Sequence, residues 1–405
     1  VHTIFNIIIL LKIIQLYFYL YDINTNMNKA YCPLLFNEIF NDSSGEYRFC
    51  CHASTSSRKY TMHTHTPFEY FNSEYMEENR NLIFSGKKLP ECEVCYVQED
   101  TIGKSWRTEE IEKYKILPTS VNKIKLKLRI NGTFCNLSCY MCAPYNSSTR
   151  RNEMKEVYPE GWKWWQHEDF VPLKSKQWEL IVDSIIENID KVSEILMTGG
   201  EPLQLPNHWK LLNRIPDKYA KQITLVYNTN FTELQYKKYH VRDIMNRFKN
   251  VHWIISCDHY GDKLQYIRYP INVKQFENNL SDTKDFINKF LQVTVSLLNI
   301  EDLIQIKEYY KNKYNINTTF GSIVNTPIIL SVRNLPEKKK EKLINLYKDK
   351  DEFNFVVSEL KQPGNSIDLQ GGIEYMTRLS KYRNIDHTKL WPEYSDKLNI
   401  TVEDK

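Results

Sequence analysis

The sequence predicts an α/β fold in which parallel strands alternate with helices and form part of a barrel. In residues 124–130, apolar side chains alternate with basic ones, which is the pattern of a strand. In residues 178–189, apolar side chains recur at helical spacing, and the apolar run 194–197 that follows ends in two glycines. A strand, a loop, a helix and a second strand in this order form a unit that builds parallel sheets.

Four further apolar runs continue this pattern, at residues 223–230, 251–258, 291–299 and 318–324. A helix is expected between the last two, over residues 304–314. Together with the two strands described above, these runs predict six strand units, and we expect a partial (β/α)6 barrel.

The C-terminal segment, residues 336–405, is predicted to be helical and to pack on the barrel. After Pro336 a charged run opens an amphipathic helix over residues 337–347, and we expect its charged side to face solvent. Residues 371–394 again carry apolar side chains at helical spacing.

Three cysteines, Cys135, Cys139 and Cys142, follow the first predicted strand at gaps of three and two residues. Three thiolates leave one iron of a four-iron cluster open, so that it can bind a substrate or a cofactor. Taken by itself, such a run also fits a zinc site or a structural role.

The segment Gly199, Gly200 and Glu201 follows the strand at 194–197. Glycines there allow the backbone to approach a ligand closely, and the glutamate can accept a hydrogen bond from a cationic amine. An ordinary turn is the alternative interpretation.

Two later strands also end in short polar side chains. Thr229 and Asn230 end the run that starts at residue 223, and Ser256 and Asp258 end the run that starts at residue 251. Ligands in parallel α/β folds collect at the carboxyl ends of the strands, so these residues are candidates for binding. Capping of turns is the alternative role for Thr229 and Asn230.

The cysteine loop followed by the Gly-Gly-Glu segment resembles the signature of the radical S-adenosylmethionine (radical SAM) enzymes. The resemblance implies a partial (β/α)6 TIM-like radical SAM barrel, in which a 4Fe–4S cluster on Cys135, Cys139 and Cys142 binds SAM through its open iron. It implies that Gly199, Gly200 and Glu201 hold the amino group of SAM. The other contacts that it implies, to the ribose and carboxylate of SAM, are Thr229, Asn230, Ser256, Asp258 and Arg268. A surface ion pair is the alternative role for Arg268.

The resemblance also implies the activity. The cluster receives an electron from a donor such as flavodoxin or ferredoxin and passes it to SAM, a carbon–sulfur bond breaks, and a 5′-deoxyadenosyl radical takes a hydrogen atom from the substrate. The substrate is unknown, and both a peptide and a small molecule fit. The alternative from another functional class is a non-catalytic zinc-binding interaction protein.

A second group of cysteines lies before the predicted barrel: Cys32, Cys50, Cys51, Cys92 and Cys95. Residues 34–40 and 47–50 are predicted to form a hairpin with Gly45 in its turn. Because adjacent residues of a strand point to opposite faces, only one of Cys50 and Cys51 is expected to join the other three. Four thiolates fit either a zinc site or a closed iron–sulfur cluster.

This region resembles the front half of the phage and bacterial twitch-domain radical SAM proteins, which belong with the SPASM/twitch enzymes. The resemblance implies an auxiliary iron–sulfur cluster, although here the extra cysteines precede the barrel instead of following it. The matching residues are Cys32-Pro33, Cys50-Cys51, residues 72–75, residues 85–95, Glu99, Gly103, Ser105 and Arg107.

The composition fits a cytoplasmic enzyme. The 54 Lys and Arg residues nearly balance the 50 Asp and Glu residues, so no nucleic-acid partner is required. Eight of the nine cysteines fall in the two groups, which indicates metal ligands in a reducing compartment and not a disulfide framework. The ninth, Cys257, is expected to be a buried small residue.

Residues 4–21 are almost continuously apolar, and Met27 stands five residues before Cys32. We interpret residues 1–26 as an over-extended reading frame and not as a membrane anchor or a signal peptide, so no membrane contact is expected. The predicted domains are thus the leader 1–26, a cysteine-rich auxiliary-cluster region 27–118, the barrel 119–335 and the helical segment 336–405.

Overall fold

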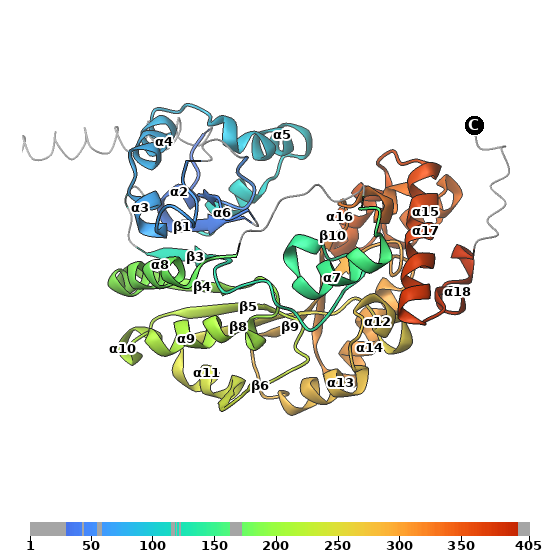
Figure 1. Cartoon of the computed structure of the whole chain (residues 1–405). Coiled ribbons are helices and arrows are strands. Elements are labelled where there is room, and N and C mark those ends of the chain that lie inside the picture. Colours follow the sequence, from blue (N-terminus) through green and yellow to red (C-terminus); the bar gives the residue numbers. More distant parts are fainter. Residues whose placement is uncertain are drawn as a thin grey trace, which may run out of the picture. The chain divides into compact units, whose positions relative to one another are not determined.

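The structure is a computed structural model that describes residues 30–42, 44–54, 59–114, 118, 120, 123–162 and 172–395. The predicted leader, residues 1–26, lies outside the described residues. The chain divides into two compact units (Figure 1). Unit 1 is the part up to Ile130 together with Leu173–Ile195, and unit 2 is Asn131–Pro172 together with the part from Leu196 onward.

Unit 1 combines the N-terminal region with the first strands of the predicted barrel. Its strands are β1 (Glu38–Asn41), β2 (Tyr47–Arg48), β3 (Ile124–Lys127) and the greater part of β4 (Val192–Met197). Its helices are α2 (Leu34–Asn37), α3 (Pro67–Phe71), α4 (Glu74–Phe84), α5 (Glu93–Ile102), α6 (Trp106–Glu112) and α8 (Ser175–Glu187).

The predicted N-terminal hairpin is confirmed, but both of its strands are shorter than expected, since the second one ends at Arg48 and not at residue 50. β1 and β2 pair antiparallel, with Phe40 opposite Arg48, and Gly45 in the turn has a φ of +88°. The prediction of a strand over residues 34–40 is wrong for its first half, because Leu34–Asn37 form the helical turn α2. An unbroken apolar run such as Leu34-Leu-Phe fits a buried helical turn as well as a buried strand, so periodicity could not distinguish them.

The hairpin extends the parallel sheet of unit 1, which the sequence did not indicate. β1 pairs parallel with β3, placing Ile39 opposite Leu126, and β3 pairs parallel with β4, placing Leu126 opposite Ile195. In β3, Ile124 and Leu126 are buried while Lys125 and Lys127 are half-buried, as their alternation predicted. One of these lysines, Lys127, pairs with the buried carboxylate of Glu38 on β1 at 2.7 Å.

Unit 2 holds the remaining strands and most of the helices. Its strands are β5 (Thr224–Thr229), β6 (Gln235–Tyr236), β7 (Tyr239–His240), β8 (Asn250–Ser256), β9 (Lys289–Val295) and β10 (Asn317–Ile323). The helices up to β10 are α7 (Ser148–Val157), α9 (Pro206–Arg214), α10 (Asp217–Ala220), α11 (Val241–Arg247), α12 (Gly261–Ile267), α13 (Val273–Asp282) and α14 (Leu303–Tyr314). Those after β10 are α15 (Glu337–Tyr347), α16 (Asn354–Leu360), α17 (Ser366–Arg383) and α18 (His387–Leu390).

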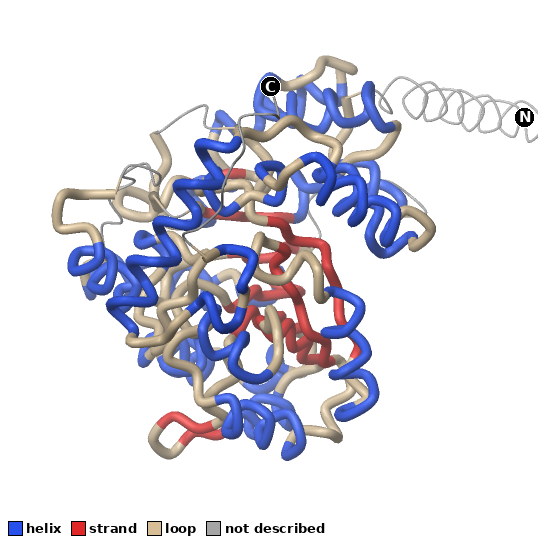
Figure 2. Tube along the Cα trace, turned by 90° about the vertical axis from the view of Figure 1, so that its right-hand side faces the viewer, coloured by secondary structure: helices blue, strands red, loops and turns tan. Residues whose placement is uncertain are grey.

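The predicted α/β class with parallel strands is confirmed. β5 pairs parallel with β8, β8 with β9 and β9 with β10, and helices separate these strands along the chain (Figure 2). Side chains alternate along β8, so that Val251, Trp253 and Ile255 are buried on one face. Since the polypeptide leaves every strand of this set in the same direction, the loops that follow the strands share one edge of the sheet.

Stacked aromatic rings fill the core beside β8. Trp253 is fully buried, with its ring 4.6 Å from that of Tyr227 and 5.7 Å from that of Phe286. The imidazole Nε2 of buried His208 lies 2.7 Å from the hydroxyl of Tyr227, and burial lowers the pKa of His208 to about 3. This histidine is therefore a neutral core residue and not a candidate acid or base.

Helix α17, in the C-terminal segment, packs against α7 (Figure 1). The ring of Tyr375 on α17 lies 6.2 Å from that of Tyr158, at the end of α7, and its hydroxyl donates to the carbonyl of Tyr140 at 2.8 Å. Within the described part of the chain, no helix is long and apolar enough to cross a membrane.

Candidate active site

The loop that carries Cys135, Cys139 and Cys142 lies in unit 2 and is fixed by backbone hydrogen bonds. Ser138 donates to the carbonyl of Tyr269 at 2.6 Å, and Tyr140 donates to that of Ile267 at 2.7 Å. Cys139 is buried between these two anchors, while Cys135 and Cys142 are half-buried. Backbone hydrogen bonds therefore fix the loop that carries the cysteines.

Polar side chains approach the sulfur atoms of Cys135 and Cys139. The amide Nδ2 of Asn230 lies 3.7 Å from Sγ of Cys135, and the guanidinium Nη1 of Arg268 lies 3.6 Å from Sγ of Cys139. Burial, followed by the charge of Cys139, raises the pKa of Cys135, and burial also raises the pKa of Cys139. Bound iron would offset this cost of forming thiolates, so the three donors fit an iron–sulfur cluster.

The Gly-Gly-Glu segment lies directly against the residue before Cys135. The amide of Glu201 donates to the carbonyl of Phe134 at 2.7 Å. At Gly200, where φ is +54°, a Cβ atom would lie only 2.1 Å from the same carbonyl oxygen. A side chain at this position would displace the cysteine loop, so glycine is required for the close approach and not only for a turn.

The carboxylate of Glu201 is buried and accepts three hydrogen bonds from the protein. Oε1 accepts from the amide of Leu203 at 3.2 Å and from the hydroxyl of Thr229 at 2.6 Å, and Oε2 accepts from the amide of Asn230 at 2.7 Å. Burial raises the pKa of Glu201 to about 7, although the three donors act in the opposite direction. A cationic ligand beside this carboxylate would favour its ionised form.

Thr229 and Asn230 therefore meet Glu201 and the cysteine loop, as expected for neighbouring strand ends. The side-chain Nδ2 of Asn230 donates to Oδ1 of Asn136 at 2.8 Å, and Nδ2 of Asn136 in turn donates to the hydroxyl of Thr232 at 2.9 Å. No motif in the sequence indicated a role for Asn136. The only signal for it was its place beside Cys135 in the loop.

Asp258 and Arg268 form a buried ion pair, with Oδ2 of Asp258 2.8 Å from Nε of Arg268. The other oxygen of Asp258 accepts from the amide of Thr294 at 2.8 Å. Arg268 thus joins Asp258 to the sulfur of Cys139 and is not a surface residue. Ser256 is half-buried at the end of β8.

Residues 130–310 match the model of the radical SAM superfamily. The chain contains a radical SAM domain. The match includes the three cysteines, the Gly-Gly-Glu segment and the ends of β5 and β8.

Several solved structures of radical SAM enzymes resemble this chain at low identity. Native anSMEcpe with bound AdoMet is 13% identical, with a TM-score of 0.38, over 60% of this chain and 64% of that one. Streptococcus suis SuiB bound to S-adenosylmethionine is 14% identical, with a TM-score of 0.36, over 72% of this chain and 56% of that one. SuiB bound to precursor peptide SuiA is 14% identical, with a TM-score of 0.34, over 84% of this chain and 59% of that one. The matched region is less than two thirds of each of these proteins, and no curated protein matches the chain.

The N-terminal cysteines lie in unit 1, outside the radical SAM domain. Cys32, Cys50, Cys92 and Cys95 are buried and line one small cavity, whereas Cys51 is exposed. Burial and the nearby Cys92 raise the pKa of Cys32, and burial and Cys95 raise the pKa of Cys92 to about 12. Of the two adjacent cysteines, Cys50 is therefore the one that faces the other three.

Arg107 also lines this cavity. Its Nη1 donates to the carbonyl of Tyr31, beside Cys32, at 2.7 Å, and its Nε donates to Glu99 at 2.9 Å. Glu99 also accepts from Ser105, the N-cap residue of α6. Among the described residues, no three His, Cys, Asp or Glu side chains are placed to hold a single metal ion.

We expect Glu201→Gln to weaken SAM binding to the iron-loaded protein by roughly tenfold or more. A charge-assisted hydrogen bond contributes about 1.5–3 kcal/mol, and glutamine keeps the volume of the side chain while losing its charge. Equilibrium titration with SAM under anaerobic conditions measures the change. Glu194→Gln, the same substitution on the half-buried Glu194 of β4, is the matched control. Equal affinity in the two variants would show that Glu201 does not hold the cofactor.

Proposed function

We propose that the protein is a radical SAM enzyme that cleaves SAM reductively at a 4Fe–4S cluster on Cys135, Cys139 and Cys142. The observation that carries this proposal is the junction of Glu201, Asn230 and Cys135. The amide of Asn230 donates to Glu201 and its side chain approaches the sulfur of Cys135, so the acidic group and the thiol lie at one place. A cofactor with an amino group bound at an open iron would fit this arrangement.

When bound, the cluster would supply the electron that breaks a carbon–sulfur bond of SAM, giving methionine and a 5′-deoxyadenosyl radical that takes a hydrogen atom from the substrate. The residues of this chain would position the reactants. Glu201 would accept from the ammonium group of SAM, and Thr229 and Asn230 would hold that carboxylate in place. We assign Gly199, Ser256, Asp258 and Arg268 to the rest of the SAM site, with Asp258 orienting Arg268.

The substrate is a peptide or a small molecule, and the electron comes from a donor such as flavodoxin or ferredoxin. A cytoplasmic location agrees with the need to protect iron–sulfur clusters from oxidants.

We further propose that Cys32, Cys50, Cys92 and Cys95 hold an auxiliary iron–sulfur cluster of the SPASM/twitch type. Their convergence on one cavity supports a shared ligand, and four thiolates would complete the coordination of a closed cluster. Arg107 supports an anionic occupant, because it places a guanidinium at the wall of the same cavity.

The proposed activity can be tested directly on the reconstituted protein. Incubated anaerobically with SAM and dithionite, the protein is expected to release 5′-deoxyadenosine and methionine, measured by chromatography. Omission of dithionite should stop the reaction, because no other electron source is present. A fully iron-loaded protein that releases no 5′-deoxyadenosine would contradict the proposal, and a protein that holds only zinc would favour the non-catalytic alternative.

A further inference from the structure

A buried cluster of three charged side chains lies behind the cysteine loop of unit 2. Arg150 and Glu153 come from α7, and Arg383 is the last residue of α17. Their side chains are at most 4% exposed. Nε of Arg383 lies 2.7 Å from one oxygen of Glu153, its Nη2 lies 2.9 Å from the other, and Arg150 also pairs with Glu153. Two guanidinium groups and one carboxylate leave a net charge of plus one.

The two arginines bind the backbone on both sides of Cys139. Nη2 of Arg383 donates to the carbonyl of Ser138 at 2.5 Å, and Nη2 of Arg150 donates to that of Tyr140 at 3.2 Å. Nε of Arg150 reaches the carbonyl of Cys142 at 3.4 Å. The side chains that form this ion pair therefore also fix the loop that carries the cysteines.

Arg383 also ties this loop to the segment that carries Arg268. Its Nη1 donates to the carbonyl of Tyr266 at 2.9 Å, two residues before Arg268. Ser138 donates its hydroxyl to Glu153, which links the loop to the carboxylate as well as to the guanidinium groups. Arg383, at the end of α17, therefore joins the cysteine loop to the segment that carries Arg268.

We propose that Arg383 and Arg150 are positioning residues that raise the reduction potential of the cluster on the cysteine loop by holding a net positive charge behind it. The inference rests on the proposed function, and it assigns a role in the reaction to the C-terminal helix. Reduction adds one negative charge to the cluster, and a buried positive charge nearby favours the reduced form. Both guanidinium groups are held within hydrogen-bond distance of the backbone of the cysteine loop, so their charge lies close to where the cluster would bind.

The alternative role is purely structural, since a buried ion pair can simply fix the packing of α17. The two roles predict different changes in the reduction potential when a positive charge is removed and when a negative charge is removed. Arg383→Gln removes a positive charge and Glu153→Gln removes a negative one, while both break the same ion pair. Under the electrostatic role the potential shifts in opposite directions in the two variants, whereas loss of packing alone has no reason to do so.

The test is a redox titration of the full, reconstituted chain, followed by the electron paramagnetic resonance signal that changes when SAM is added. At a fixed potential, Arg383→Gln is expected to lower the ratio of reduced to oxidised cluster on the order of tenfold, equivalent to about 59 mV for one electron. Glu153→Gln is expected to raise this ratio, and Arg383→Lys, which keeps the charge, should stay near the parent.

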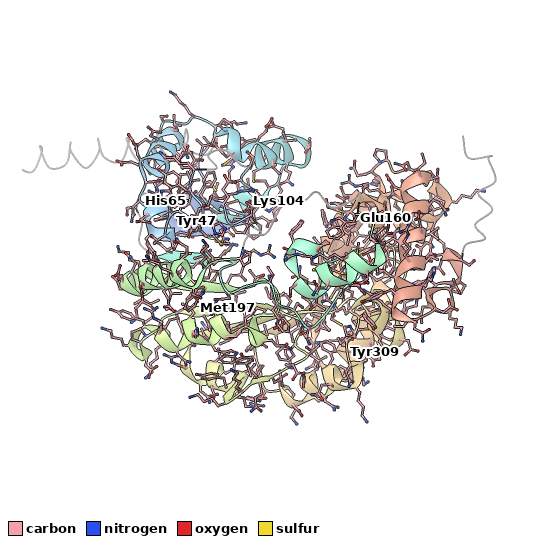
Figure 3. All side chains as sticks on the ribbon, in the orientation of Figure 1. Tyr47, His65, Lys104, Glu160, Met197 and Tyr309 are labelled. Atoms are coloured by element: carbon pink, nitrogen blue, oxygen red, sulfur yellow. The ribbon has the colours of Figure 1, made fainter. Side chains whose placement is uncertain are left out.

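Arg378→Gln is the matched control on the same helix. Arg378 is 36% exposed and pairs with Glu160 at 2.6 Å, a residue labelled in Figure 3. Its removal should leave the potential unchanged, because solvent screens exposed charges.

An unchanged potential in an iron-loaded Arg383→Gln variant would overturn the inference. If that variant does not hold iron, the Glu153→Gln variant alone tests the inference. A reduction potential of Glu153→Gln that falls or stays the same would contradict the proposed role. Loss of iron from both variants would also overturn the inference, because the structural role would then be a sufficient explanation. Failure of the proposed function itself is distinguishable, because the parent would then give no signal that responds to SAM.

Discussion

Replacement of Cys135, Cys139 and Cys142 together by alanine is expected to remove about four of about eight irons and to abolish SAM cleavage. In the proposed site these residues would supply every bond between the protein and the catalytic cluster, so none of its irons would be retained. The remaining iron would belong to the N-terminal cysteines. Iron analysis of anaerobically reconstituted protein and the yield of 5′-deoxyadenosine measure the two effects.

Cys257→Ala is the matched control for this experiment. Cys257 is fully buried at the end of β8, and its sulfur lies 3.3 Å from the carbonyl of His259. It is a core thiol, as the sequence predicted, and its loss should leave the iron content and the activity in place. If the triple variant kept all of its iron, the assignment of the catalytic cluster to this loop would be wrong.

Cys50→Ala is expected to remove the auxiliary cluster, about four irons, while Cys51→Ala keeps it. The two residues are neighbours in sequence, but only Cys50 lines the cavity with Cys32, Cys92 and Cys95. The pair therefore compares the same chemical change at a buried and at an exposed position. Because the cluster would join three separate segments of unit 1, Cys50→Ala should also lower the temperature at which this unit unfolds.

Iron analysis and thermal unfolding of the two variants, both reconstituted in the same way, provide the measurement. The reverse result, with iron lost only from Cys51→Ala, would show that the ligand has been assigned to the wrong residue. Zinc in place of iron at this site would contradict the auxiliary cluster but leave the catalytic cluster unaffected.

Much of the fold could be predicted because its signals are local. β8 follows the alternation of Val251, Trp253 and Ile255, and α15 has the predicted bounds Glu337–Tyr347. The meeting of Thr229 with Glu201 could also be anticipated, since the ends of neighbouring parallel strands lie at one edge. Periodicity failed where a run was short and entirely apolar, as at Leu34–Asn37.

The parts of the site that could not be predicted depend on contacts between distant residues. Arg383 binds the carbonyl of Ser138 across 245 positions of sequence, and nothing near Arg383 indicates a role beside the cysteine loop. Similarly, the alternation of side chains along a strand predicted that only one of Cys50 and Cys51 would face inward. The structure shows that Cys50 is the buried one, and this depends on how the chain after β2 packs.

The pairing of β1 with β3 has a consequence for the handling of the protein. β1 covers a side of β3 that would otherwise present unpaired backbone amides and carbonyls, and such an edge can recruit a strand from a second molecule. Cys32 lies just before the α2–β1 segment and Cys50 just after β2, so the proposed auxiliary ligands stand at both ends of this hairpin. Oxidative loss of a cluster at that site would weaken the packing of the hairpin and could expose the edge of β3. Aggregation of the protein is therefore expected to accompany the loss of iron.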